Sequence, residues 1–390
     1  MRILFTTAPA YGHFNPLIPL AAAFQRQGHT VAVATSARFG PVVEAAGFTS
    51  LATGVNTLVA EFQTTMPPPK PGRPGFADIF INGLAGPMVT DLLALIPAWG
   101  ADLIVHEANE FGGPTSAEIL DLPHVAVGIN IMAFEPELLD FFIGPEYADF
   151  RSSHSLPADP LYQEYFRYLY LHPAPPSISV VPQSVARVTQ LLRPDLPEFP
   201  ERTTGSSIVI AGMPITPERK TVYVTLGTVF GQAGGHPLFQ TVISALQDEP
   251  LTIVITTGGH GNVLAIPPNS TMRATVAAES YIPLAEVLPR CDLVISHGGV
   301  GTILGALRYG LPQLVLPIAA DQGWNAQRLS DLGAAVMLNP ATADVKEVRA
   351  AVQHLLGSGS YRERAKQLQA DLAAMPSPED VAGTIVHMAT

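Results

Sequence analysis

Short apolar runs alternate with helix-like stretches along this chain, and the alternation starts twice. The first series contains the apolar runs Ile3–Thr7 and Thr30–Ala34, with a helix-like stretch over Pro16–Gln27 between them. The second series begins at Thr221–Thr225 and continues through Asp292–Ser296. Strands and helices that alternate in this way predict a parallel sheet with helices on both faces. The sequence therefore predicts an α/β fold with two doubly wound domains.

A proline-rich stretch over Leu192–Lys220 separates the two series, and its composition is typical of a linker. With a boundary near residue 216, we expect an N-terminal domain over residues 1–215 and a second domain over residues 216–375. Residues 376–390 are predicted to form a C-terminal helix that packs back on the N-terminal domain. Two doubly wound domains leave a cleft between them, and ligands bind outside the carboxyl ends of the strands.

Composition excludes several classes of protein. The chain has 390 residues, more than one ordinary domain, and a net charge of −12 without a basic stripe, so a nucleic-acid duplex is not an expected partner. The single cysteine, Cys291, excludes an internal disulfide and a cysteine zinc cluster, and it suits a reducing cytoplasm. Cys291 could be a nucleophile, but the apolar run after it indicates core packing. No unbroken run of about 18 apolar residues occurs, so no membrane span is expected.

One predicted strand ends in a glycine-rich turn that leads directly into a helix. Gly298, Gly299 and Gly301 allow the backbone to approach a ligand closely. The start of the helix offers unpaired amides and the positive end of the helix dipole, which suit a diphosphate. His297, at the end of the strand, can donate a hydrogen bond to a phosphate oxygen, and Thr302 can add a hydroxyl. The segment therefore predicts a nucleotide-binding turn.

The same glycines permit a second interpretation. The pattern Gly299-x-Gly301-x-x-x-Gly305 is close to a dinucleotide fingerprint, and Asp321 follows about twenty residues later. Three features disfavour an NAD site: the pattern lies in the second domain, a histidine without a role in dinucleotide binding precedes it, and Gln322 directly follows the acidic residue. A tight turn without any ligand is a third interpretation.

Several motifs together resemble glycosyltransferase family 1, most closely the actinobacterial branch that decorates antibiotics and similar metabolites. The run from Ser296 to Pro317, followed by Ala-Asp-Gln-Gly-Trp-Asn-Ala from Ala320, resembles the donor-binding signature of that family. Val-Thr-Leu-Gly-Thr at 224–228, Tyr-Ile-Pro-Leu-Ala-Glu-Val-Leu-Pro at 281–289 and Gly-His-Phe-Asn-Pro at 12–16 also match. The motifs occur in family order along nearly the whole chain, so the set is specific although each motif alone is weak.

This resemblance implies a GT-B fold, with two Rossmann-like domains that face a cleft, and an inverting hexosyltransferase-type reaction. It implies no metal and no cofactor besides a nucleotide-diphosphate sugar, and the sequence has no Asp-x-Asp element of the kind that metal-dependent glycosyltransferases use. In the family, the residue matched by His297 binds the diphosphate and the pair matched by Asp321 and Gln322 binds hydroxyls of the sugar. The remaining donor contacts implied by the resemblance are the phosphate-facing Thr228 and the nucleobase segment Tyr281, Ile282 and Pro283.

One departure from the family bears on the nucleotide. UDP-sugar enzymes of the plant branch carry a glutamate eight residues after the phosphate-binding histidine, where it binds the ribose hydroxyls. That position is Gly305 in this chain. Because a site without the carboxylate offers no hydrogen bond to a 2′-hydroxyl, we expect a dTDP-sugar, with a UDP-sugar as the alternative.

The N-terminal motif provides a candidate base. His13 is expected in a loop after the first strand, pointing into the cleft, where an imidazole with a pKa near working pH suits proton removal from an acceptor. A lone loop histidine is also common as a surface or capping residue, and the resemblance is what favours catalysis. Alignment puts Glu107 where the family has an aspartate that orients the base. Asn109 and His106 are alternative partners for His13.

The acceptor is the least constrained part of the prediction. Residues 134–170 are rich in Phe and Tyr, which indicates either a surface loop with core packing or a mobile wall around an apolar substrate, and residues 65–76 are predicted to be irregular. We expect a small aromatic or polyketide acceptor, in antibiotic or other secondary metabolism. A donor-binding auxiliary protein and another GT-B enzyme, such as a sugar-nucleotide epimerase, are alternatives. The oligomeric state stays open, with a homodimer among the options.

Overall fold

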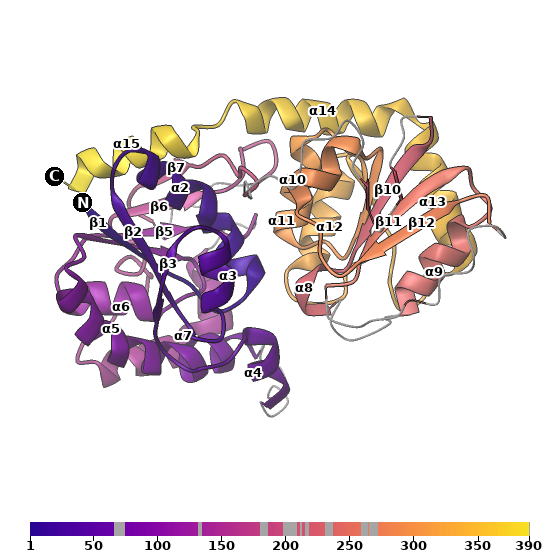
Figure 1. Ribbon diagram of the computed structural model, residues 1–390. Coiled ribbons are helices and arrows are strands. Elements are labelled where there is room, and N and C mark those ends of the chain that lie inside the picture. The colour runs from indigo at the N-terminus through magenta and orange to yellow at the C-terminus, as the bar shows by residue number, and fades with distance from the viewer. Residues whose placement is uncertain are drawn as a thin grey trace. The chain divides into compact units, whose positions relative to one another are not determined.

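The chain separates into two compact units, each built on one parallel sheet (Figure 1). Unit 1 comprises Met1–Asp195 with Met375–Thr390, and unit 2 comprises Leu196–Ala374. The structure is a computed structural model that describes residues 1–65, 75–131, 135–179, 186–197, 209–210, 213–214, 218–230, 237–258, 264 and 272–389. The expected boundary near residue 216, and most of the stretch 65–76, lie outside the described residues.

Within the described part of unit 1, seven parallel strands lie in the order β3-β2-β1-β4-β5-β6-β7. The inner strand β1 pairs with β2 on one side and β4 on the other, and Thr6 lies beside both Ala34 and His106. The carboxyl ends of these strands therefore meet at one edge of the sheet. The strands are β1 (Arg2–Thr6), β2 (Thr30–Thr35), β3 (Thr49–Ala52), β4 (Leu103–Glu107), β5 (His124–Val127), β6 (Leu169–His172) and β7 (Thr189–Leu191).

Alternate side chains of these strands pack on two different cores. Ile3 and Phe5 contact one core, which also includes Phe24 of α2 (Ile18–Arg26) and Ile385 of α15 (Pro378–Ala389). Leu4 points to the opposite face. The C-terminal helix α15, yellow in Figure 1, thus belongs to unit 1 although it is last in the chain. The other helices of unit 1 are α1 (Tyr11–Phe14), η1 (Asn15–Leu17), α3 (Gly40–Ala45), α4 (Val59–Thr65), η2 (Asp78–Ala85), α5 (Gly86–Trp99), α6 (Gly112–Ile119) and α7 (Pro136–Ser153).

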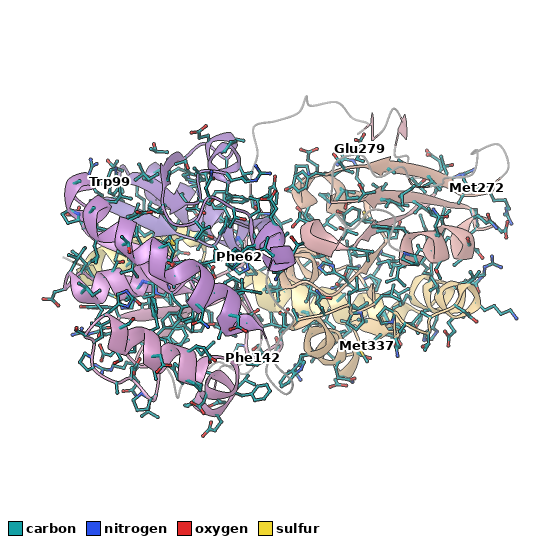
Figure 2. All side chains as sticks on the ribbon, turned by 90° about the horizontal axis from the view of Figure 1, so that it is seen from below. Phe62, Trp99, Phe142, Met272, Glu279 and Met337 are labelled. Atoms are coloured by element: carbon teal, nitrogen blue, oxygen red, sulfur yellow. The ribbon has the colours of Figure 1, made fainter. Side chains whose placement is uncertain are left out.

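One helical stretch of unit 1, Asp78–Trp99, combines η2 with α5 and is long and apolar enough to cross a membrane, with a mean hydropathy of 1.7. The expectation of no membrane span rested on the absence of an unbroken apolar run, and in this segment Asp78, Asn82 and Asp91 interrupt the run. Its side chains Ile81 and Leu92 are buried in two cores of unit 1. The stretch ends at Trp99, which is labelled in Figure 2. The guanidinium of Arg2 lies 4.3 Å from the centre of the Trp99 ring. These contacts are typical of a helix packed against a domain core.

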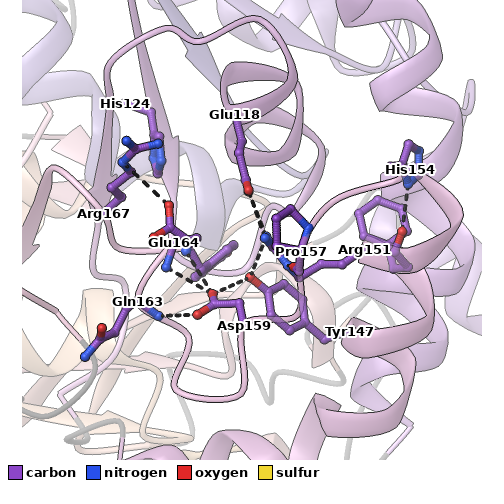
Figure 3. A network of polar contacts seen from close by, with 12 residues as sticks. Glu118, His124, Tyr147, Arg151, His154, Pro157, Asp159, Gln163, Glu164 and Arg167 are labelled. Atoms are coloured by element: carbon purple, nitrogen blue, oxygen red, sulfur yellow. Dashed lines mark hydrogen bonds and ion pairs between the residues drawn. The ribbon is translucent and has the colours of Figure 1, made fainter.

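The aromatic stretch after residue 134 is mostly core, not a surface loop. Residues 136–153 form α7, and Tyr147, Tyr165 and Phe166 are buried in the core beneath it. Arg151, whose side chain is 2% exposed, donates two hydrogen bonds of 2.7 and 2.8 Å to Glu118 (Figure 3). This ion pair joins α7 to α6. The carboxylate of Asp159 accepts hydrogen bonds from the Tyr147 hydroxyl and from the backbone amides of Gln163 and Glu164.

Unit 2 repeats the same architecture. Its described residues form a sheet of six parallel strands in the order β12-β11-β10-β13-β14-β15, which confirms the predicted pair of doubly wound sheets. The strands are β10 (Lys220–Thr225), β11 (Leu251–Thr256), β12 (Thr275–Glu279), β13 (Leu293–Ser296), β14 (Gln313–Val315) and β15 (Ala335–Met337). The helices are α8 (Gly227–Phe230), α9 (Pro237–Leu246), α10 (Leu284–Val287), η5 (Leu288–Arg290), α11 (Val300–Arg308), α12 (Gln322–Asp331), α13 (Val345–Gly357) and α14 (Gly359–Ala373). A short antiparallel pair joins β8 (Val209–Ile210) to β9 (Met213–Pro214).

Cys291 lies in the core of unit 2, where its thiol donates to the carbonyl of Val287 at 3.1 Å. Burial raises the pKa of the thiol to about 12, with a smaller contribution from the neighbouring Asp292 carboxylate. Because the thiolate is the reactive form of cysteine, this environment favours the core-packing interpretation over a nucleophile.

Candidate active site

His13 lies on the one-turn helix α1 and not in an open loop as the sequence suggested. Its Nδ1 is 2.8 Å from Oε1 of Glu107, and the His13 and Glu107 side chains are 15% and 0% exposed. An ionised carboxylate only accepts hydrogen bonds, so this contact assigns the ring hydrogen to Nδ1 and leaves the lone pair on Nε2. The contact therefore fixes the orientation of the imidazole ring.

Glu107 is the last residue of β4 and is held from several sides. The backbone amide of Asn109 donates to its Oε2 at 2.6 Å, and the amide of Ala8 donates to its Oε1 at 3.4 Å. Neither alternative partner contacts the His13 ring among the described hydrogen bonds. Asn109 contributes its backbone to Glu107, and the His106 ring is buried, with its Nε2 3.3 Å from Nδ1 of His124.

A small cavity of about 20 Å³, roughly the space of one water molecule, lies near this pair in unit 1, although neither His13 nor Glu107 lines it. Phe80 lines it and packs against the His13 ring, with centroids 5.2 Å apart. The carboxyl ends of the central strands and the helical stretch 78–99 supply the walls, which are mainly apolar. The polar side chains of the lining are Thr7, Ser36, Thr53, Asn109 and Glu110.

In unit 2, the expected glycine-rich turn follows β13 and places His297 against two glycines. A Cβ atom added to Gly299 would lie 2.7 Å from Nε2 of the ring, and one added to Gly227 would lie 2.7 Å from Cε1. Gly227 also has a φ of +73°, in the region that favours glycine. These two positions therefore require glycine if the imidazole is to keep its place. The sequence analysis included Gly227 in the motif at 224–228 but assigned it no role.

His297 is 8% exposed, and burial lowers its pKa to about 4, although a hydrogen bond with the Thr225 backbone acts in the opposite direction. The ring is therefore neutral at pH 7 and can offer a hydrogen bond to a phosphate but no positive charge. Positive potential at this position comes from the N-terminus of α11, which starts beside Gly299 and contains the buried Thr302. A Cβ added to Gly301 would meet no described atom within 4 Å, so this part of the turn is open.

Asp321 and Gln322 lie at the start of α12. The side-chain oxygen of Gln322 accepts the amides of Ile318 and Ala319 at 2.8 and 3.0 Å, so it shapes the preceding loop. The side-chain Nδ2 of Asn325 donates to Oδ2 of Asp321 at 2.9 Å and to the carbonyl of Gly298 at 3.0 Å. Asn325 thus joins this loop to the glycine-rich turn, a role that the sequence analysis missed.

The remaining donor candidates occupy other strand ends of the same sheet. Thr228 follows β10 on α8, and Tyr281 follows β12 and is 40% exposed. Ile282 is buried in the core, and Pro283 precedes α10. Carboxyl ends of parallel strands meet at one edge, so the sheet gathers these residues with His297 at a position where α/β folds bind ligands.

Comparison with known proteins identifies the family. Residues 241–388 match the family model described as "Erythromycin biosynthesis protein CIII-like, C-terminal domain". The chain is 30% identical to L-demethylnoviosyl transferase of Streptomyces niveus, over 98% of this chain and 97% of that protein. The chain belongs to the antibiotic glycosyltransferase family of actinomycetes. It is also 26% identical to aklavinone 7-beta-L-rhodosaminyltransferase of Streptomyces galilaeus, over 98% of this chain and 94% of that protein.

Solved structures of glycosyltransferases confirm the GT-B fold. The glycosyltransferase SnogD from Streptomyces nogalater superposes with a TM-score of 0.79 at 25% identity, and the match covers 100% of both chains. SsfS6 from Streptomyces sp. SF2575 superposes with a TM-score of 0.72 at 26% identity over 99% of both chains. The predicted enzyme class, glycosyltransferase, is thus confirmed.

In this glycosyltransferase, Gly305 lies on the buried face of α11. An added Cβ atom would be 3.3 Å from Cδ2 of Leu196 and from Cδ1 of Leu288, and 3.4 Å from Cδ1 of Leu284. The position is therefore surrounded by leucine side chains, and a glutamate would have to displace them.

Proposed function

We propose that this glycosyltransferase moves a deoxysugar from dTDP to a hydroxyl of a small apolar natural product, with inversion at the anomeric carbon. The observation that carries the proposal is the 2.8 Å contact between Nδ1 of His13 and Oε1 of Glu107 near mainly apolar side chains. In this scheme the acceptor-binding domain is residues 1–215 and the donor-binding domain is residues 216–375. The reaction takes place in the cytoplasm.

The base acts in one concerted step. Nε2 of His13 takes the proton of the acceptor hydroxyl as its oxygen bonds to the anomeric carbon, and the bond from that carbon to the diphosphate breaks. Glu107 stabilises the imidazolium that forms, because its carboxylate already accepts the Nδ1 hydrogen. General-base catalysis of this kind contributes about 10²- to 10⁴-fold in rate. Attack from the face opposite the leaving group inverts the anomeric centre.

The leaving diphosphate takes up the negative charge. We propose that it binds at the N-terminus of α11, where backbone amides and the helix dipole favour anions. His297 donates a hydrogen bond as a neutral imidazole, and Thr228 and Thr302 supply hydroxyl contacts. Preorganised donors of this kind stabilise charge that develops in the transition state.

Asp321 and Gln322 are proposed to bind hydroxyls of the sugar, and Tyr281 the nucleobase. Since the side-chain oxygen of Gln322 accepts two loop amides, its NH₂ group is the part that would donate to the sugar.

Three observations support dTDP over UDP. Residue 305 is a glycine packed among leucine side chains, so this position offers no carboxylate to ribose hydroxyls. A relative that is 26% identical is named TDP-daunosamine transferase DnrS. Solved structures with the same fold, SsfS6 and VinC, are complexes with thymidine diphosphate. Turnover of a UDP-sugar about tenfold faster than that of the matching dTDP-sugar would contradict this assignment.

Apolar side chains near His13, among them Phe80, Leu84 and Phe111, suit an aromatic or polyketide acceptor, since ligand sites combine apolar walls with a few polar groups. The names of two relatives, an aklavinone and a tylactone glycosyltransferase, also support this class of acceptor.

The test is mass spectrometry of reactions that contain dTDP- and UDP-sugars with a panel of polyphenols and polyketides. The wild type should yield a product heavier by one sugar, and His13→Ala should lose it. A His13→Ala variant that keeps most of the activity would refute the base. Binding of dTDP without any conjugate across a broad panel would favour an auxiliary donor-binding protein.

A further inference from the structure

A second buried carboxylate lies three residues after Glu107 and has no part in the reaction described above. Glu110 is 4% exposed, lines the small cavity near His13, and comes from the turn that connects β4 to α6. A buried carboxylate needs compensating hydrogen bonds, because its transfer from water is otherwise strongly unfavourable. The contacts that compensate it indicate its role.

The partners of Glu110 come from two different elements. The hydroxyl of Thr6, the last residue of β1, donates to Oε2 at 2.5 Å. The amide of Gly113, in the first turn of α6, donates to Oε2 at 2.8 Å and to Oε1 at 3.0 Å, and the amide of Gly112 also donates to Oε1. Glu110 therefore joins the end of β1 to the N-terminus of α6, where the helix dipole favours a negative charge.

Both glycines are needed for this contact. A Cβ atom added to Gly112 would lie 2.8 Å from Oε1 of Glu110, and one added to Gly113 would lie 2.6 Å from Oε2. The sequence Glu-Phe-Gly-Gly thus builds a close-fitting site for the chain's own carboxylate.

The turn that carries Glu110 also carries Glu107. The amide of Glu110 donates to the carbonyl of Glu107 at 3.0 Å, and the amide of Asn109 donates to the Glu107 carboxylate at 2.6 Å. In addition, the hydroxyl of the buried Tyr165 donates to the carbonyls of Ala108 at 2.9 Å and Glu110 at 3.2 Å. A shift of Glu110 would therefore move the backbone that presents Glu107 to His13.

We propose that Glu110 is a positioning residue, which anchors the turn 107–110 between β1 and α6 and thereby fixes the carboxylate of Glu107 against His13. This inference rests on the proposed function of that pair. The hydrogen bonds of Glu110, and not its charge, carry the role. Burial raises the pKa of Glu110 to about 7, so the neutral form is accessible near neutral pH, and glutamine resembles that form in shape.

The variants are Glu110→Gln, Glu110→Ala and Thr6→Val, with Thr35→Val as the matched control. Thr35 is a buried threonine on the neighbouring strand β2, and its hydroxyl donates to the carbonyl of Thr7 at 3.0 Å without contact to Glu110 among the described hydrogen bonds. Steady-state kinetics with a dTDP-sugar, and with an acceptor that the wild type glycosylates, give kcat and both KM values. NMR of protein labelled with [15N]histidine reports the Nδ1 hydrogen of His13, assigned by its absence in His13→Ala.

We expect Glu110→Ala to lower kcat about 10- to 100-fold, the range expected when a catalytic group is misplaced by about an ångström. Both KM values should stay within about twofold, and the low-field signal of the His13 Nδ1 hydrogen should weaken or disappear. Glu110→Gln should retain a clearly higher kcat than Glu110→Ala, because its NH₂ group can donate to Thr6 while its oxygen accepts the Gly112 and Gly113 amides; it loses only the 2.8 Å contact of the Gly113 amide with Oε2. Thr6→Val should lower kcat by about threefold or more, and Thr35→Val should not.

Three results would overturn the proposal: a Glu110→Ala variant with wild-type kcat and an unchanged His13 signal, a Glu110→Gln variant as impaired as Glu110→Ala, or an acceptor KM raised about tenfold at constant kcat. The last would make Glu110 an acceptor contact. If Glu110→Ala does not fold, Thr6→Val and Glu110→Gln decide the question. Failure of the proposed function is recognised separately, because His13→Ala would then keep its activity.

Discussion

Replacing Gly299 with alanine should weaken binding of dTDP to this glycosyltransferase by about 10- to 100-fold. The added methyl group would lie 2.7 Å from Nε2 and 2.9 Å from Cε1 of His297, closer than side-chain carbons approach such atoms in folded proteins. Gly227 approaches the same edge of the ring, with its own hypothetical Cβ 2.7 Å from Cε1 and 2.8 Å from Nε2. The ring must therefore move away from its present position.

The backbone itself should tolerate this substitution. Gly299 has a φ of −65° and a ψ of 137°, an extended conformation that alanine adopts without strain. The effect should thus be confined to the imidazole. A hydrogen bond to a charged group contributes about 1.5–3 kcal/mol, and each 1.4 kcal/mol corresponds to tenfold in affinity, which gives the expected range.

The assay is isothermal titration calorimetry with dTDP at pH 7.5, with circular dichroism as a check of folding. Gly357→Ala is the control, because a Cβ atom at that position, the end of α13, would meet no described atom within 4 Å. The reasoning would be refuted if Gly299→Ala bound dTDP within twofold of wild type, since the imidazole would then not contribute to binding.

Three further predictions concern the base, a buried ion pair and the effect of acid. Glu107→Gln should lower kcat about 10²-fold or more without changing the affinity for dTDP, because a neutral amide stabilises the imidazolium poorly; an unchanged kcat in steady-state kinetics would contradict the pairing. Arg151→Met should lower the free energy of unfolding by about 3–5 kcal/mol in a urea titration, since it leaves Glu118 without its partner, whereas a loss below about 1 kcal/mol would argue against a stabilising role. Thermal stability should fall as the pH drops from about 6.5 towards 4, because buried histidines whose folded pKa lies near 4 must charge on unfolding. Among the described residues, Glu110, whose pKa is raised, acts in the opposite direction over that range. A melting temperature constant between pH 7 and 4.5 would refute this prediction. The histidines are His124, His172 and His297.

Sequence patterns were most informative where a strand is buried on both faces. Leu293–Ser296 is fully buried and Lys220–Thr225 is buried except at Lys220, and the sequence predicted these strands over Asp292–Ser296 and Thr221–Thr225, close to the observed bounds. Thr49–Ala52 and Thr189–Leu191 are only partly buried at the two edges of the sheet in unit 1, and the sequence analysis did not identify them. Edge strands do not need continuous apolar side chains, because one side of such a strand has no neighbour in the sheet.

The local chemistry of the donor turn was also accessible from the sequence. A strand, glycines and a helix start occur within a few residues around His297, so their proximity follows from chain connectivity alone. The burial that lowers the pKa of this histidine to about 4 depends on Gly227 and its neighbours, which precede it by about 70 residues in the chain. No local pattern could reveal that a distant glycine lies against the ring.

The sequence by itself therefore determined the fold class, the two series of strands and the glycosyltransferase family, because these depend on periodicity and on contiguous motifs. Tertiary structure alone decided which carboxylate contacts the base and what holds it there. His13 and Glu107 are 94 residues apart, and Thr6 and Glu110 are 104 residues apart. They meet because β1 and β4 are neighbours in a parallel sheet, so that the loops following both strands emerge at the same edge.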